Sequence, residues 1–200
     1  MGLPARKLDR HYTYADYRTW PEDERWELIH GVAWNMSAAP ATGHQRISMD
    51  LAARIHAFLR GGPCEVLAAP VDVFLPAHPD QPEDDVDTVV QPDIVVICDQ
   101  AKVTPRGIWG APDWVIEILS PYTSRKDMKE KLELFEENGV KEYWIVDPGN
   151  RYVHVYHLGE SGYGEPRVYV EPATVPSATC QGLELPLVEV FKAASIGERR

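Results

Sequence analysis

The pattern of apolar and polar residues predicts two amphipathic helices with strands around them. Between Thr42 and Gly61 the apolar residues recur every three or four positions, as one buried face of a helix requires. These residues are Ile47, Leu51, Ile55, Phe58 and Leu59. Thr42 and Gln45 match a capping box at the start of this helix, and Gly61-Gly62-Pro63 ends it. The second helix is expected to begin at Ser124, capped with Asp127, and to stop at Asn138-Gly139.

Strand-like runs account for most of the remaining chain. A short helix opening at Thr13 should precede a strand or hairpin that bends at Gly31. Apolar runs predict strands over 65–75, 88–98 and 113–119, followed by shorter strands over 142–146, 151–157 and 167–170. This order of elements is typical of an α/β domain with a mixed sheet.

Composition narrows the class of protein. The 200 residues are 44% hydrophobic, which suits a single folded domain over 1–200. No apolar run reaches the roughly 18 residues of a membrane span, and the first residues lack a signal-peptide pattern, so a cytoplasmic protein without a membrane partner is expected. A net charge of −11 opposes non-specific nucleic-acid binding over the whole surface but permits a local site. The acids of 79–87, unaccompanied by any base, predict a solvated and mobile loop.

The cysteines predict no disulfide framework and no structural zinc site. Cys64, Cys98 and Cys180 are odd in number, far apart and without a C-x-x-C spacing. Cys98 ends an apolar run, so we expect it to pack as a small hydrophobic residue.

Asp93 and Glu117 occupy runs that otherwise look buried. Asp93 shares its face of the run with Val89 and Val95. Glu117 shares its face with Val115. A buried carboxylate must protonate, find a partner or bind a metal. The two acids therefore either form structural salt bridges or lie at a sheet edge in contact with water. The functional alternative is that they bind Mg²⁺ (or Mn²⁺), which prefers such oxygen ligands.

Four segments resemble those of a known group of nucleases. They are 26–31 (WELIHG), 91–95 (QPDIV), 115–121 (VIEILSP) and 139–147 (GVKEYWIVD). Their order resembles the PD-(D/E)XK nuclease superfamily, and more closely the Uma-type family of restriction-endonuclease-like bacterial proteins. The resemblance implies a restriction-endonuclease-like mixed sheet flanked by helices, with a nuclease-like core over 26–147 and a β-rich C-terminal extension over 151–190. It also implies Mg²⁺-dependent hydrolysis of DNA, with Asp93, Glu117 and the Ile118 carbonyl as metal ligands.

The catalytic lysine of that superfamily must come from a different position here. The usual place, two residues after the second acid, is Leu119. In families of this type the lysine role moves to the following helix, where helical geometry places Lys131, unlike Lys126 and Lys129, on the apolar side. Lys131 would orient the attacking water or stabilise charge on the phosphate. The alternative is an ordinary pair between Lys131 and Asp127, four residues earlier.

Two further residues are candidates for the site. Glu27 resembles the early acid of the family and could complete the metal shell or hold Lys131; otherwise it is a surface strand residue. His44, in the first turn of its helix, could contact a substrate phosphate, or it could be an ordinary polar residue at a helix start.

Three functions remain open from the sequence. The first is a DNA endonuclease, expected to be a homodimer because cutting a duplex needs two sites. The second is a non-catalytic nuclease-fold module that binds nucleic acid or a partner protein, with its carboxylates locked in salt bridges. The third is an enzyme of the same fold that acts on a different phosphate substrate.

Overall fold

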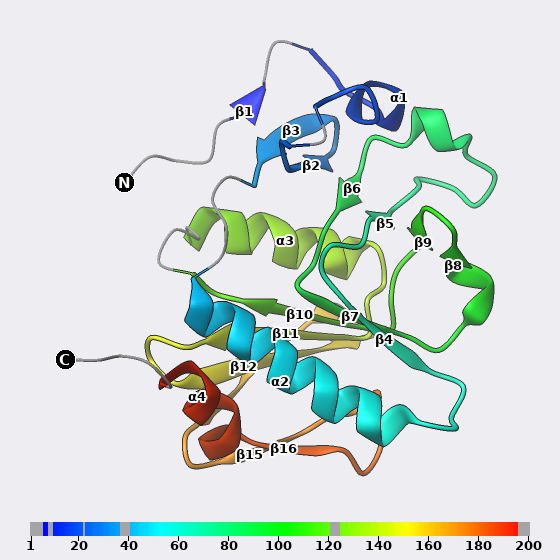
Figure 1. Ribbon diagram of the computed structural model, residues 1–200. Coiled ribbons are helices and arrows are strands. Elements are labelled where there is room, and N and C mark those ends of the chain that lie inside the picture. The colour runs from blue at the N-terminus through cyan, green and yellow to red at the C-terminus, as the bar shows by residue number, and fades with distance from the viewer. Residues whose placement is uncertain (1–5, 8–9, 22, 37–40, 121–124, 196–200) are drawn as a thin grey trace.

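A computed structural model describes residues 6–7, 10–21, 23–36, 41–120 and 125–195 of the chain. The described residues form two larger sheets, a two-stranded sheet and four α-helices (Figure 1). No helix among them is long and apolar enough to cross a membrane.

The first sheet has seven strands in the order β1-β3-β2-β6-β5-β9-β8. Their bounds are Arg6–Lys7 (β1), Trp26–Ile29 (β2), Val32–Asn35 (β3), Val73–Phe74 (β5), Val89–Val90 (β6), Val103–Thr104 (β8) and Gly107–Trp109 (β9). Only β5 and β9 run parallel. The hairpin of β2 and β3 turns at His30 and Gly31, which both adopt positive φ, and this confirms the predicted bend.

The second sheet has the order β13-β12-β11-β10-β7-β4, with β14 also pairing with β12. Its strands are Glu65–Ala68 (β4), Ile94–Ile97 (β7), Trp114–Ile118 (β10), Glu142–Asp147 (β11), Tyr152–Gly159 (β12), Gly162–Tyr163 (β13) and Arg167–Val170 (β14). Strands β10 and β11 are parallel while β7 and β10 are antiparallel, so the sheet is mixed as predicted. Strands β15 (Thr174–Pro176) and β16 (Glu184–Pro186) form the small third sheet.

The described helices are α1 (Tyr14–Tyr17), α2 (Thr42–Leu59), α3 (Arg125–Glu137) and α4 (Leu187–Ser195), and two 3₁₀ turns span Glu83–Asp85 and Gln100–Lys102. Helix α1 packs with residues of the first sheet, whereas the other three helices cover both faces of the second sheet. Helices α2 and α4 pack on one face, where Ile47 and Phe191 meet Ile116 in a buried cluster (Figure 1). Helix α3 packs on the other face, where Phe135 shares a second cluster with Val115. That cluster also includes residues of the first sheet, so α3 lies between the two large sheets.

Two runs that looked like single strands are each divided between the two sheets. The run over 65–75 breaks into β4 and β5, and the run over 88–98 breaks into β6 and β7. Each break contains a proline, Pro70 or Pro92, which has no N–H to donate to a strand ladder. Val89 therefore belongs to the other sheet, and the prediction that it shares a face with Asp93 was wrong. The backbone leaves the ladder at these crossings, and polar side chains gather there.

The predicted caps had different outcomes. At Thr13 the backbone N–H donates to the Asp16 carboxylate at 3.1 Å, and α1 follows as predicted. The capping box at Thr42 was wrong because Thr42 is already helical and Ala41 occupies the N-cap position. The expected cap at Ser124 lies outside the described residues.

The expectation that the chain lacks disulfides was also wrong. Cys64 and Cys98 form a disulfide with a Cα–Cα distance of 3.9 Å. Strands β4 and β7 are antiparallel with Glu65 opposite Ile97, so the same register brings the two cysteines together across 34 residues of sequence. Strand pairing sets this proximity, and the spacing of cysteines along the chain does not reveal it. Cys180 is free and buried.

The acidic segment over 79–87 makes contacts with bases that lie elsewhere in the sequence. Arg18 pairs with Asp84 at 3.0 Å, and Arg106 pairs with Glu83. Val86 within the segment is buried, and its carbonyl accepts the Tyr14 N–H at 2.7 Å. The segment is therefore attached to α1 and the β8–β9 turn, whereas its predicted mobility stays a prediction.

Glu142 is a fully buried carboxylate of β11 that fastens residues 177–179 to the second sheet. Its Oε1 accepts hydrogen bonds from Trp144 Nε1 at 2.8 Å and from the Ala178 N–H at 3.2 Å. Its Oε2 accepts from Ser177 Oγ at 3.0 Å and from the Thr179 N–H at 2.7 Å. Both oxygens are thus saturated by donors, as a buried charge requires.

Replacing Glu142 with glutamine should lower the free energy of unfolding by about 3 kcal/mol, because the amide NH₂ would face donors whichever way it turned. Urea denaturation measures this change. Glu184→Gln, at an exposed position of β16, makes the same chemical change and should alter stability by less than about 0.5 kcal/mol. Equal stabilities of the two variants would contradict the fastening role.

Candidate active site

The structure places Asp93 and Glu117 opposite each other on neighbouring strands. Asp93 directly precedes β7, and Glu117 lies in β10. These strands are antiparallel with Ile94 opposite Ile116, and one further step of the register sets Asp93 opposite Glu117. Glu117 lies on the α3 side of β10 with Val115, and the Asp93 carboxylate accepts the N–H of Ile118, the residue after Glu117, at 2.8 Å. The two carboxylates therefore converge at the point where β7 begins.

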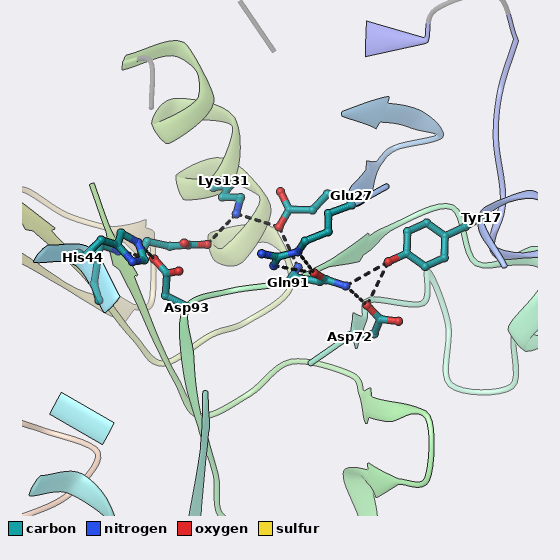
Figure 2. A network of polar contacts seen from close by, with 10 residues as sticks. Tyr17, Glu27, His44, Asp72, Gln91, Asp93 and Lys131 are labelled. Carbon is teal, nitrogen blue, oxygen red and sulfur yellow. Dashed lines mark hydrogen bonds and ion pairs between the residues drawn. The ribbon is translucent and has the colours of Figure 1, made fainter. Parts of the chain in front are cut away.

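Lys131 reaches this pair of strands from α3. Its Nζ donates to Glu117 Oε1 at 2.7 Å and to Glu27 Oε1 at 2.9 Å (Figure 2). Helical spacing sets this direction, because Lys131 precedes the buried Leu134 and Phe135 by one turn. The Lys131 side chain is 15% exposed, whereas that of Lys129 is 74% exposed and pairs with Glu133. The expected inward position of Lys131 is confirmed, and its partners are the two acids; the side chain of Asp127 lies outside the described part.

Glu27 reaches the site from the other sheet. It lies in β2 and is only 4% exposed, so the alternative of a surface strand residue was wrong. Its Oε1 accepts the Gln91 N–H at 2.8 Å in addition to Lys131. Glu27 therefore holds Lys131 from the side opposite Glu117.

His44 contacts Asp93 from the first turn of α2. Its Nε2 lies 3.1 Å from Asp93 Oδ2, which also accepts the Ile118 N–H at 2.8 Å. The residue is 8% exposed. These two contacts fix the orientation of the Asp93 carboxylate, so the position of His44 suits support of Asp93 better than an open phosphate contact.

Burial and neighbouring charges shift the pKa values of three residues in this cluster. Burial raises the pKa of Glu117 to about 7; the charges of Asp93 and Glu27 add to the rise and Lys131 opposes it. Burial alone would lower the pKa of Lys131, but Glu117 and Glu27 outweigh it and raise the pKa above its ordinary value. Burial also acts to lower the pKa of His44, and the contact with Asp93 more than compensates, so that pKa is raised as well. Glu117 and Glu27 hold a firmly protonated Lys131, and Asp93 lies close enough to raise the pKa of Glu117. The three acids outnumber Lys131 and His44, so the cluster can accept further positive charge.

Comparison with models of known protein families assigns the chain to a family. A family model described as "Uma2: Putative restriction endonuclease" matches residues 14–188. The chain belongs to the Uma2 family. The resemblance found in the sequence is thereby confirmed, and so is the nuclease-like character that the family description carries.

Two proteins are similar to this Uma2 chain over most of its length. The uncharacterized protein slr1290 of Synechocystis sp. is 25% identical over 150 residues, which cover 74% of each protein. A crystal structure described as a putative nuclease belonging to DUF820, from Anabaena variabilis, has a TM-score of 0.74 at 23% identity. The match covers 91% of this chain and 98% of that chain, and it confirms the restriction-endonuclease-like fold.

The donor atoms of this Uma2 site fit a magnesium ion. Asp93 Oδ1 and Glu117 Oε2 accept no hydrogen bond from any described residue, so each carboxylate keeps one oxygen available. No group of three or more His, Cys, Asp or Glu side chains capable of holding a metal occurs in the described part of the chain. Two carboxylates with a negative surplus of charge are nevertheless the set that Mg²⁺ uses, since it takes one or two carboxylates and retains several waters.

The polar network extends beyond the residues predicted from the sequence. Gln91 accepts a hydrogen bond from Arg25 Nη2 at 2.9 Å and donates to Asp72 Oδ1 at 2.8 Å (Figure 2). Tyr17 completes this part by donating to Asp72 Oδ1 at 3.2 Å. Asp72 could have been found by the signal that identified Asp93, since it too is an acid inside an apolar run. Tyr17 and Arg25 gave no such signal, because only the contact between the two sheets brings them to the site.

Proposed function

We propose that this Uma2 protein is a Mg²⁺-dependent endonuclease that hydrolyses DNA phosphodiester bonds. The observation that carries the proposal is the position of Lys131. The superfamily's usual lysine position is occupied by Leu119, and Lys131 from α3 lies instead within 2.7 Å of Glu117. A nuclease site needs two acids and a nearby cation, and the described residues provide both at one point.

Asp93 and Glu117 would hold the metal, and the Ile118 carbonyl would join them by resemblance to the family. When bound, Mg²⁺ (or Mn²⁺) would polarise a phosphate oxygen and lower the pKa of the attacking water. Asp93 is kept in place for this task by His44 and by the Ile118 N–H. Such fixed ligands avoid reorganisation during the reaction.

Lys131 would stabilise the negative charge that grows on the phosphate as the bond breaks. Its ammonium is protonated and is aimed by two carboxylates, so its position does not depend on the substrate. Glu27 acts as a positioning residue for Lys131, and the Gln91 N–H holds Glu27 in turn. The arrangement places a cation beside the acids without a lysine on the strand itself.

The net charge of −11 favours the rival function, a nuclease-fold module whose carboxylates serve only as salt bridges. The excess of buried acids over bases around Lys131 favours the enzyme, because unbalanced carboxylates can bind a metal ion. A homodimer, with one site for each DNA strand, belongs to the same proposal.

Nicking of supercoiled plasmid DNA tests the proposed function. We expect the plasmid to be converted to the open-circular form in Mg²⁺ or Mn²⁺ and to stay supercoiled in EDTA. The reason is that the divalent ion held by Asp93 and Glu117 is needed to activate the attacking water. Calorimetric titration with Mn²⁺ gives an independent measure of metal binding. Metal-independent DNA binding with no cleavage in either ion would instead support the non-catalytic module.

A further inference from the structure

A pocket lies next to the site, where the chain crosses between the two sheets. It has a volume of about 300 Å³. Val71, Val103, Pro105 and Ile108 contribute apolar walls, while Asp72, Gln91, Thr104 and Arg106 contribute polar groups. A cavity of this size that combines apolar walls with polar groups suits a small organic group.

Asp72 offers one free acceptor to this pocket. Its Oδ1 is occupied by Gln91 Nε2 at 2.8 Å and by the Tyr17 hydroxyl at 3.2 Å. Its Oδ2 has no hydrogen-bond donor among the described residues and points away from both partners (Figure 2). Gln91 has no spare capacity, because its Oε1 accepts from Arg25 and its amide group donates to Asp72 and Tyr17. Asp72 Oδ2 is therefore the acceptor that a ligand would meet.

The pocket is joined to the catalytic cluster through a single residue. The Gln91 side chain lines the pocket, while the Gln91 N–H holds Glu27, the partner of Lys131. Gln91 is therefore shared by the pocket and by the contacts that hold Lys131. Arg106 also lines the pocket, and its guanidinium is held by Glu83.

We propose that this pocket receives a nucleobase of the nucleic acid next to the cleaved phosphate and that Asp72 selects bases with an exocyclic amino group. The inference rests on the proposed nuclease function, which supplies the nucleic acid. The apolar lining residues would pack against a base, and contacts of apolar side chains with bases are typical of unstacked nucleotides. An ionised carboxylate accepts from the amino group of cytosine, whereas the corresponding carbonyl of uracil would be repelled.

Asp72→Asn should reverse this preference. Gln91 Nε2 and the Tyr17 hydroxyl both donate toward position Oδ1, so the amide oxygen must remain there and the NH₂ must face the pocket. The acceptor then becomes a donor, which suits the carbonyl of uracil and opposes the amino group of cytosine.

The test measures binding of dCMP and dUMP to the full chain by calorimetry without divalent metal. Both probes carry the same phosphate and sugar, so their difference reports the base edge alone. The wild type should bind dCMP at least about tenfold more tightly than dUMP, the worth of one charge-assisted hydrogen bond. Asp72→Asn should remove or invert that ratio, while Asp80→Asn, an equal loss of charge at an exposed position of the acidic segment, should retain it.

The outcomes separate the pocket from the nuclease activity. Equal affinities for dCMP and dUMP, no binding of either, or an unchanged ratio in a folded Asp72→Asn variant would overturn the proposal for the pocket, whatever the plasmid assay gives. Thermal unfolding verifies that Asp72→Asn is folded. If the variant does not fold, the ratio of dCMP to dUMP affinity in the wild type still tests the proposal. A tenfold preference in a protein that fails to nick DNA would support the pocket and refute the nuclease function.

Discussion

Replacing Lys131 with methionine should lower the rate of Mg²⁺-dependent DNA cleavage by about 10²–10³, the effect of removing one donor from a transition state. Methionine keeps an unbranched side chain of similar length in the space between α3 and β10. It lacks the ammonium group that contacts Glu117 and Glu27. The loss should therefore fall on the chemical step, which single-turnover measurements at saturating metal would isolate.

Mn²⁺ binding should survive this substitution, because Lys131 is not a ligand and Asp93 and Glu117 remain. The variant leaves two buried carboxylates without their cation, so its thermal unfolding must be recorded beside its activity. If Mn²⁺ titration failed while the variant stayed folded, Lys131 would be organising the metal ligands and not acting on the phosphate.

Lys129→Met is the matched control. Lys129 lies on the same helix two residues earlier, and its side chain is 74% exposed and pairs with Glu133. An exposed pair of this type contributes little to stability, so its loss should leave cleavage near the wild-type rate. Inactivity of Lys129→Met, or full activity of both variants, would refute the assignment of the lysine role to Lys131.

The sequence predicted those parts of the site that depend on local spacing. The helical period alone directed Lys131 inward, and the strand alternation put Glu117 on the same face as Val115. The order of motifs predicted the family and its fold, both of which are confirmed. The inward positions of Lys131 and Glu117 each arise within a single helix or strand, where periodicity is informative.

The remaining features depend on how distant segments meet. Glu27 gave no sign of burial, because its strand pairs in a different sheet from Glu117 and reaches it only across α3. The link from Tyr17 through Asp72 to Gln91 likewise joins three segments far apart in the chain. The disulfide between Cys64 and Cys98 follows from the register of β4 and β7, which no spacing of cysteines encodes. Pairing between strands is therefore what sequence periodicity could not predict.

Asp93→Asn should abolish detectable DNA cleavage, a fall of at least about 10³, since the metal supplies several kcal/mol of transition-state stabilisation. Asparagine has nearly the same shape as aspartate but no negative charge. Its side-chain oxygen can still accept from the Ile118 N–H and approach His44, so the local fold should survive. Mn²⁺ titration should show a matching loss of affinity, because a neutral amide is a poor substitute for a carboxylate ligand.

The control for this variant lies at the other end of the same strand. Asp99 follows β7, and its carboxylate accepts the Ala101 N–H at 3.0 Å, a bond that asparagine can also accept. Asp99→Asn removes the same charge from the same strand and should retain both metal binding and cleavage. The decisive comparison is metal affinity against rate. If purified Asp93→Asn bound Mn²⁺ normally but did not cleave DNA, Asp93 would act on the substrate or the water, and the metal would be held elsewhere. If Asp93→Asn cleaved DNA at the wild-type rate, the activity would not belong to this site.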